Sequence, residues 1–160
     1  MILSRSVIFF GSVVFSVSGL CGCVSSQQET LTASEIKQSA LYSEEAGICQ
    51  ERNSSRMWQV EKGETFSSLR AAESYAENLE LGGYDDWRLP TREELLQLHK
   101  IFFWKKNGNC SMNQKGDYWY SSGSREYAIG RFETQYLFCG PEFKFVESRR
   151  GKGYVRAVRP

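Results

Sequence analysis

The sequence predicts a compact α+β domain, and three observations lead to this fold class. Two segments in the middle of the chain repeat their apolar residues at intervals of three and four, as amphipathic helices do. The segments that follow are short, alternating and aromatic, with glycine, asparagine and serine between them, which is typical of antiparallel strands. The chain has 160 residues, of which 14% are aromatic, and this is enough for one domain with a core but not for two. We therefore expect two helices followed by an antiparallel set of strands.

The first predicted elements are a strand and a helix. Residues 57–60 form a short run of strand-forming side chains after a turn-prone stretch of asparagine and serine. Ser67 or Ser68 can serve as the N-cap of the helix. The apolar face of that helix consists of Leu69, Ala72, Ala76 and Leu79. We expect Gly82 and Gly83 to end it.

The second predicted helix begins at a capping box. Thr91 would accept a hydrogen bond from the backbone N–H of Glu94, and the Glu94 side chain would reach back to Thr91. Pro90 keeps the chain extended just before this point. The helix is expected to run from Arg92 to about Phe102. Its inward face would consist of Leu95, Leu98 and Phe102.

Four later segments are predicted to be strands because apolar and aromatic residues alternate with polar ones in each. They are Asp117–Ser121, Ala128–Glu133, Phe143–Val146 and Tyr154–Val158.

Residues 1–22 have the organisation of an export signal. A basic start precedes an apolar run of about fourteen residues, shorter than the roughly 20 that a membrane-spanning helix needs. The run ends in Leu20, Cys21, Gly22 and Cys23, a tetrad that resembles the bacterial lipobox. Small Gly22 leaves room at the scissile bond, and the Cys23 thiol would take the diacylglyceryl group. An ordinary secretory signal or a simple apolar anchor is the alternative.

The expected organisation is therefore a lipoprotein signal peptide over residues 1–22, a lipidated N-terminus and flexible tether over 23–44, and a domain over 45–160. The tether is rich in serine, glutamine, glutamate and threonine and has few large apolar groups to bury. Two or three acyl chains on Cys23 would hold the protein on a membrane of the cell envelope. Val24 follows in place of an aspartate, which by the usual sorting rule predicts the outer membrane.

Three cysteines remain in a compartment where disulfides persist. Cys110 and Cys139 both lie in turn-rich surroundings, where a bridge would join two loops, whereas Cys49 precedes the first predicted strand. We expect a Cys110–Cys139 disulfide, which leaves Cys49 free, buried or paired between molecules.

Several motifs together resemble one family. They are Leu81–Leu98 with its Tyr84-Asp85-Asp86-Trp87-Arg88-Leu89-Pro90 core, Met57-Trp58-Gln59, Tyr118-Trp119, Ser121-Ser122 and Tyr154–Arg159. With these motifs, residues 48–160 resemble the Lcl C-terminal domain family, named after a bacterial collagen-like adhesin. The chain departs from the family pattern at Tyr120, where a serine usually follows the Tyr-Trp pair.

The resemblance implies a compact fold related to the C-type-lectin-like and formylglycine-generating-enzyme folds, with two helices and a small twisted sheet joined by long loops. It also implies that the motif residues are structural, as core side chains or, for Arg88, as a donor to loop carbonyls. These residues are Trp58, Trp87, Arg88, Leu89, Pro90 and Trp119.

The sequence carries no motif for known catalytic chemistry. It has no glycine-rich phosphate loop, no Gly-x-Ser-x-Gly elbow and a single histidine, His99, so we expect neither an enzyme nor a metal site. A reactive pair formed by Cys110 and Cys139, as in the formylglycine-generating relatives, is the alternative. No cofactor is expected, although Asp85 and Asp86 could supply oxygens to calcium.

The charge of the chain is unevenly distributed. Residues 61–94 carry nine acidic against four basic side chains, whereas residues 144–160 carry six basic side chains against one acidic. With the aromatic residues between them, these bases could hold a sulfated or carboxylated polysaccharide. A solvated face that pairs with the acidic segment is the alternative. The candidate ligand-binding residues are Arg125, Arg131, Arg149, Arg150, Lys152 and Arg156.

Two functions fit these observations. The first is a surface-anchored, adhesin-like module that binds an anionic glycan. The second is an envelope lipoprotein that contacts another protein through the apolar run Phe102-Phe103-Trp104. Nucleic acid is not expected as a partner because the chain is predicted to be exported.

Overall fold

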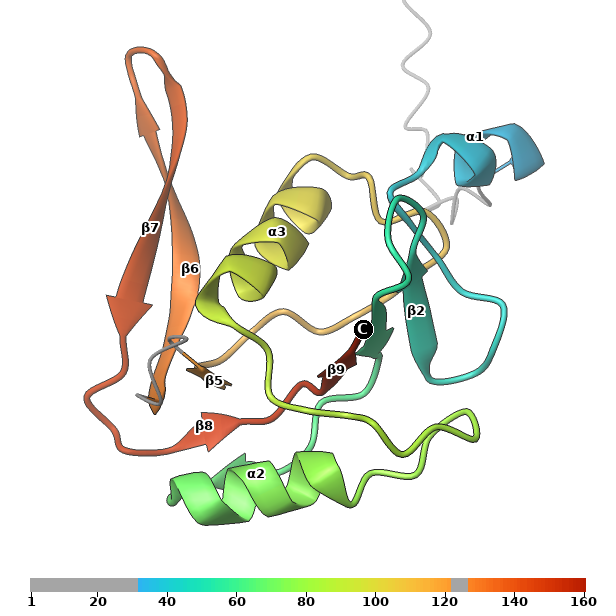
Figure 1. Ribbon diagram of the computed structural model, residues 1–160. Helices are drawn as coiled ribbons and strands as arrows, with labels where there is room; N and C mark the ends of the chain where they lie inside the picture. Colours follow the sequence, from blue (N-terminus) through green and yellow to red (C-terminus); the bar gives the residue numbers. More distant parts are fainter. Residues whose placement is uncertain (1–31, 122–126) are drawn as a thin grey trace, which may run out of the picture.

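The structure is a computed structural model that describes residues 32–121 and 127–160 (Figure 1). The predicted signal peptide, Cys23 and Arg125 lie outside the described residues. Two short helices and one longer helix pack with two sheets, which confirms the α+β class. The elements in chain order are α1 (Ala33–Gln38), β1 (Leu41–Tyr42), β2 (Ile48–Glu51), β3 (Met57–Gln59), β4 (Thr65–Phe66), α2 (Leu69–Glu77), α3 (Arg92–Phe103), β5 (Tyr118–Ser121), β6 (Tyr127–Leu137), β7 (Gly140–Glu147), β8 (Gly153–Tyr154) and β9 (Val158–Arg159).

The strands form two sheets rather than the single sheet that was expected. One has the order β1-β2-β3-β9 and the other β4-β8-β5-β6-β7. Every pairing is antiparallel except that of β5 with β8. The predicted strand Tyr154–Val158 is divided between them, because β8 ends at Tyr154 and β9 begins at Val158. The residues between β8 and β9 bond to the end of β3 and to the segment after it, and so join the two sheets. The Gln59 N–H donates to the Ala157 carbonyl at 3.0 Å, and the Gly63 N–H donates to the Val155 carbonyl at 2.8 Å.

The capping signals place the starts of both principal helices. Ser68 is the N-cap of α2, and its hydroxyl accepts from the Ala71 N–H at 3.3 Å. Thr91 and Glu94 form the predicted capping box of α3 with bonds of 3.1 and 2.8 Å. Helix α2 ends at Asn78, earlier than the glycine pair that was expected to end it, and that pair instead turns the chain afterwards.

Two clusters of buried side chains form the core. In one, Leu95 and Leu98 of α3 pack with Trp58, Tyr118 and Tyr120. The other holds the buried face of α2. Its fully or nearly buried members are Ile48, Ala72, Ala76, Trp87, Leu89, Trp119, Ile129, Val155 and Ala157. Pro90 is also fully buried, so most of the motif residues lie inside the domain.

The folded part begins before residue 45, which corrects the expected boundary. Leu41 is fully buried in the first cluster, and β1 pairs with β2. The backbone N–H of Ala40 also donates to the Lys106 carbonyl at 2.8 Å. The segment that reads as tether from composition therefore contributes an edge strand.

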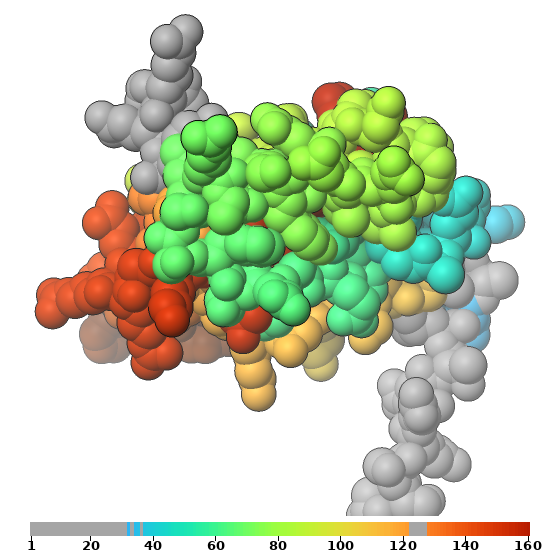
Figure 2. Space-filling model, turned by 90° about the horizontal axis from the view of Figure 1, so that it is seen from below, coloured from blue at the N-terminus to red at the C-terminus, as the bar shows by residue number. Residues whose placement is uncertain are grey.

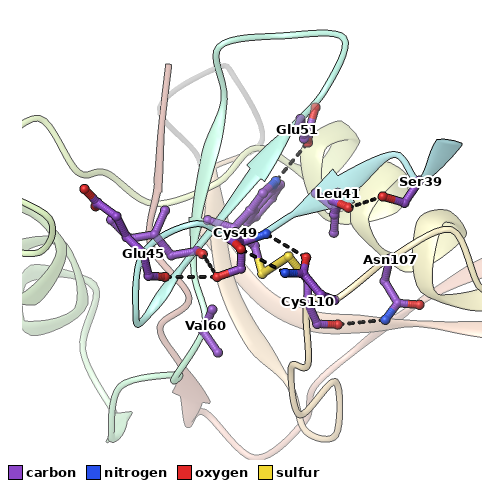
Figure 3. Close-up of a disulfide and its surroundings, with 12 residues drawn as sticks. Ser39, Leu41, Glu45, Cys49, Glu51, Val60, Asn107 and Cys110 are labelled. Atoms are coloured by element: carbon purple, nitrogen blue, oxygen red, sulfur yellow. Dashed lines mark hydrogen bonds between the residues drawn. A yellow bond between two sulfur atoms is a disulfide. The ribbon is translucent and has the colours of Figure 1, made fainter. Parts of the chain in front are cut away.

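The disulfide joins Cys49 to Cys110, so the expected Cys110–Cys139 bridge is wrong (Figure 3). The two Cα atoms lie 5.9 Å apart, and both side chains are buried in the first cluster. Cys139 instead lies in the turn between β6 and β7, where it is exposed and free. Cys110 points inward after α3, whereas the hairpin carries Cys139 away from the core.

Among the described residues, no helix is both long and apolar enough to cross a membrane.

Candidate functional site

An open cavity of about 1070 Å³ lies beside the five-stranded sheet. Its wall comes mainly from the end of β7, the loop to β8, and the two residues just before β5. In the view from below (Figure 2), the red segment that follows β7 stands out at one side of the molecule, beside the green segment that leads into α2. The residues that line the cavity are Thr65, Gly116, Asp117, Arg131, Val146, Glu147, Ser148, Arg149, Arg150, Lys152 and Tyr154. We refer to it as the basic cavity.

Four of the predicted ligand-binding residues meet in the basic cavity. Arg131 reaches it from β6, while Arg149, Arg150 and Lys152 come from the loop between β7 and β8. The last three are exposed. The sequence brings them together because the antiparallel hairpin returns the end of β7 to the level of Gly130 and Arg131.

Arg156 does not belong to this group, which corrects the prediction. Its side chain is fully buried. The guanidinium donates to the carbonyls of Gln59 at 2.8 Å and Asn113 at 2.7 Å, and also to the Val60 carbonyl. A group held in this way fixes the segment between the sheets and is not accessible to a glycan.

Arg131 is already paired with carboxylates of the domain. Its guanidinium donates to Asp117 at 2.6 Å and also bonds Glu133. Burial raises the pKa of Asp117, but hydrogen bonds from Ser148 and Arg131 and the positive charges of Arg131 and Arg150 outweigh it, so the pKa lies below its usual value. Arg131 therefore forms a fixed part of the wall. The positive charge that no ion pair among the described residues engages comes from the β7–β8 loop, beside the exposed carboxylate of Glu147.

Tyr154, one of the aromatic residues expected among the bases, forms another side of the cavity, and Lys62 lies over its ring. The Lys62 ammonium lies 3.7 Å from the centre of the Tyr154 ring and donates to the Lys115 carbonyl. Burial, followed by the charge of Arg156, lowers the pKa of Lys62. Gly116, at φ +109°, lets the chain pass the ring, since a Cβ there would lie 2.6 Å from a Tyr154 ring carbon. The sequence does not indicate the role of Lys62, because its contact with Tyr154 joins two segments that are far apart in the chain.

A family model described as the Lcl C-terminal domain matches residues 47–159. The chain belongs to this family. Neither the curated proteins nor the solved structures provide a significant match. Membership in the Lcl C-terminal domain family suggests an adhesin-like binding module.

The Leu-Pro-Thr-Arg-Glu-Glu segment of this Lcl C-terminal domain has a structural role. Glu94 is buried, accepts two hydrogen bonds of 2.8 Å from Arg88, and forms an ion pair with Arg56 at 3.2 Å. Burial raises the pKa of Glu94, but the hydrogen bonds from Arg88 and Thr91 and the arginine charges outweigh it and lower the pKa. Arg88 also donates to the Leu89 carbonyl at 3.1 Å. This network holds the loop before α3 against the helix.

The remaining candidates are engaged elsewhere in the Lcl C-terminal domain. Both carboxylate oxygens of Asp86 accept bonds from Arg159, so this member of the suggested calcium pair is occupied by a guanidinium. Within the described residues, no group of three acidic, histidine or cysteine side chains is placed to hold a metal ion. His99 bonds the Thr134 hydroxyl at 2.9 Å, and burial lowers its pKa.

Proposed function

We propose that this chain is a lipid-anchored protein of the cell envelope whose Lcl C-terminal domain binds an anionic glycan in the basic cavity. The anchor would be diacylglyceryl on Cys23, the address the outer membrane, and binding would need neither catalysis nor a cofactor. A C-type-lectin-like arrangement, in which loops beside a small sheet hold the ligand, is part of the same proposal.

The observation that carries the proposal is the free positive charge of the β7–β8 loop. Ion pairs among the described residues engage Arg56, Arg88, Arg131 and Arg159. Arg149, Arg150 and Lys152 are exposed beside them in the wall of a cavity of about 1070 Å³, which has room for several sugar units. Two guanidinium groups and one ammonium can bind sulfate or carboxylate groups with charge-assisted hydrogen bonds.

The aromatic contribution to binding differs from the one first expected. Phe143 packs against His99 and Phe103, and Phe145 packs against Tyr120, so both rings lie under α3 and away from the cavity. Charge and hydrogen bonding therefore supply most of the proposed affinity, with Tyr154 as the one aromatic wall.

The test is retention of residues 27–160 on immobilised heparin across a salt gradient, with a neutral glycan column beside it. Cys139→Ser is included to prevent dimers, since Cys49 is needed for the disulfide. Retention on heparin alone, lost as the screening length falls to about 8 Å near 0.15 M salt, supports the proposal.

A matched pair of variants locates the binding. Changing Arg149, Arg150 and Lys152 to serine should abolish retention. The control removes three exposed positive charges from the other end of the domain, and should retain most of the binding: Lys37→Ser, Lys105→Asn and Lys106→Ser. Equal loss in both variants would mean that net charge, rather than the basic cavity, is responsible.

Contact with another envelope protein is the second candidate. The expected surface, Phe102-Phe103-Trp104, is only partly available, because Phe102 packs on the core and Phe103 packs edge-on against Phe143. Trp104 is about half exposed. A protein contact of this apolar kind would persist at high salt, whereas glycan binding would not.

A further inference from the structure

All four large apolar side chains that are exposed among the described residues lie at one end of the molecule. Tyr136, Leu137 and Phe138 form the tip of the β6–β7 hairpin, and Trp104 follows the end of α3. The exposed fractions are 76%, 59%, 112% and 53%, respectively. Phe103 connects the two parts, with its ring centre 6.1 Å from that of Tyr136 and 4.8 Å from that of Trp104. We call this group the apolar tip.

The apolar tip and the basic cavity lie at opposite ends of one hairpin. β7 begins beside the tip at Gly140 and ends at Glu147 in the cavity wall, a span of roughly 23 Å at 3.3 Å per residue. In Figure 1 the β6–β7 turn projects above the rest of the domain, and β8 lies below the other end of the hairpin. The two surfaces can therefore act separately.

We propose that the apolar tip contacts the lipid bilayer to which the chain is anchored. The inference rests on the lipid anchor of the proposed function. This contact would orient the domain with the hairpin tip in the membrane interface and the basic cavity facing away from the membrane.

The position of the chain entry supports this occupant. The N–H groups of Ala40 and Leu41 donate to the Lys106 carbonyl at 2.8 and 3.3 Å, so the segment after α1 lies beside the end of α3. Glu35 and Gln38 of α1 also line one small pocket with Lys105 and Lys106. Cys23 precedes Thr32 by nine residues, which can span at most roughly 30 Å even when fully extended. A bilayer that holds Cys23 is thus kept close to the end that carries the apolar tip.

The composition of the tip also favours lipid over a protein. Tryptophan, tyrosine and lysine together are typical of the membrane interface, and Lys105 and Lys106 are exposed beside Trp104. Lys100 adds positive charge near Phe103, with its ammonium 5.6 Å from the centre of the Phe143 ring. Glu142 of β7 contributes a carboxylate close to the tip, opposite Gln135 in the register.

The native cysteine at the tip provides the test. The full chain is reconstituted into vesicles of phosphatidylcholine and phosphatidylglycerol, with an environment-sensitive fluorophore on Cys139, the exposed thiol. Cys139→Ser gives the background from any other thiol. We expect the chain to float with the vesicles, the emission to shift to the blue, quenching by aqueous iodide to fall severalfold, and brominated lipids to quench the probe.

Two variants assign the effect to the tip. Leu137→Ser with Phe138→Ser should restore iodide quenching while the chain still floats and still binds heparin. The triple serine variant at Arg149, Arg150 and Lys152 is the control at the opposite end, and its probe should stay protected.

Three results would overturn the inference. If the chain floats but iodide still quenches the probe, the tip contact is contradicted while the lipid anchor is supported. A chain that does not float contradicts both. A probe shielded from iodide but untouched by brominated lipids, with Cys139-linked dimers, would assign the tip to a second copy of the chain.

Discussion

Reduction of the Cys49–Cys110 disulfide is expected to lower the free energy of unfolding by about 4 kcal/mol. The bond joins residues 61 positions apart, and the chain-entropy treatment of a loop of that length gives this magnitude. It also ties β2 to the loop after α3 within the first core cluster. The loss should therefore affect the whole domain rather than one loop.

Urea unfolding of the oxidised and reduced domain measures this effect. With a urea m value of about 2 kcal/mol/M, the midpoint should fall by about 2 M on reduction. Cys139→Ser should leave the midpoint unchanged, because that thiol is exposed and free. The reasoning would be refuted if Cys139→Ser abolished the effect of the reductant, since that outcome requires Cys139 to be in the bridge.

Three further substitutions test the packing around the site. Gly116→Ala should cost about 1–3 kcal/mol and lower Tm, because an alanine at φ +109° is strained and its Cβ would meet the Tyr154 ring; an unchanged Tm would contradict the close contact. Glu94→Gln should cost about 2 kcal/mol near neutral pH, because the ion pairs with Arg88 and Arg56 are lost and a neutral amide accepts only one of the two Arg88 bonds. The pKa of Glu94 is lowered despite its burial, so the stability that its charge contributes is complete above the ordinary value of 4.5 and is lost as the pH falls through the lowered pKa. The difference in the free energy of unfolding between Glu94→Gln and wild type should therefore become smaller in acid. Urea unfolding at a series of falling pH values measures this difference, and a constant value would contradict the role of the Glu94 charge. Arg156→Met should cost at least about 3 kcal/mol because three carbonyls lose their donor; a variant with native stability that no longer binds heparin would return Arg156 to the binding site.

The sequence predicts best those features that depend on interactions between residues close together in the chain. The Thr91 capping box, the Ser68 cap and the inward faces of α2 and α3 depend on residues within four positions of one another. Each could therefore be read directly from the chain, whereas the end of α2 could not, because Asn78 closes the helix before the glycines are reached.

Long-range pairing was the main source of error. β3 pairs with β9 across about a hundred residues, and β1 joins that sheet from a segment whose polar composition suggests a tether. The prediction of the disulfide is wrong for the same reason. Turn-forming neighbours indicate that a cysteine lies in a loop, but they do not indicate whether its side chain points toward the core. Cys110 faces the core, and Cys139 lies at the tip of a hairpin.

The candidate site was predicted in part. A count of charges identifies the β7–β8 loop as basic, but it treats Arg156 like its neighbours and cannot detect that three backbone carbonyls enclose it. The hairpin register that brings Arg131 to the same wall, and the Asp117 carboxylate that engages it, depend on strand pairing. The positive charge left for a ligand is therefore smaller and more localised than the sequence suggests.

The most direct test of the central claim is to observe where a sulfated oligosaccharide contacts the domain. Backbone amide shifts of the ¹⁵N-labelled domain would be followed by NMR during a titration. Saturable shifts concentrated at Asp117, Arg131 and residues 147–152, with little change at residues 136–140, are the predicted result. Saturable shifts that instead centre on the hairpin tip, or no shifts at all while the domain is folded, would contradict the assignment of the basic cavity as the glycan site.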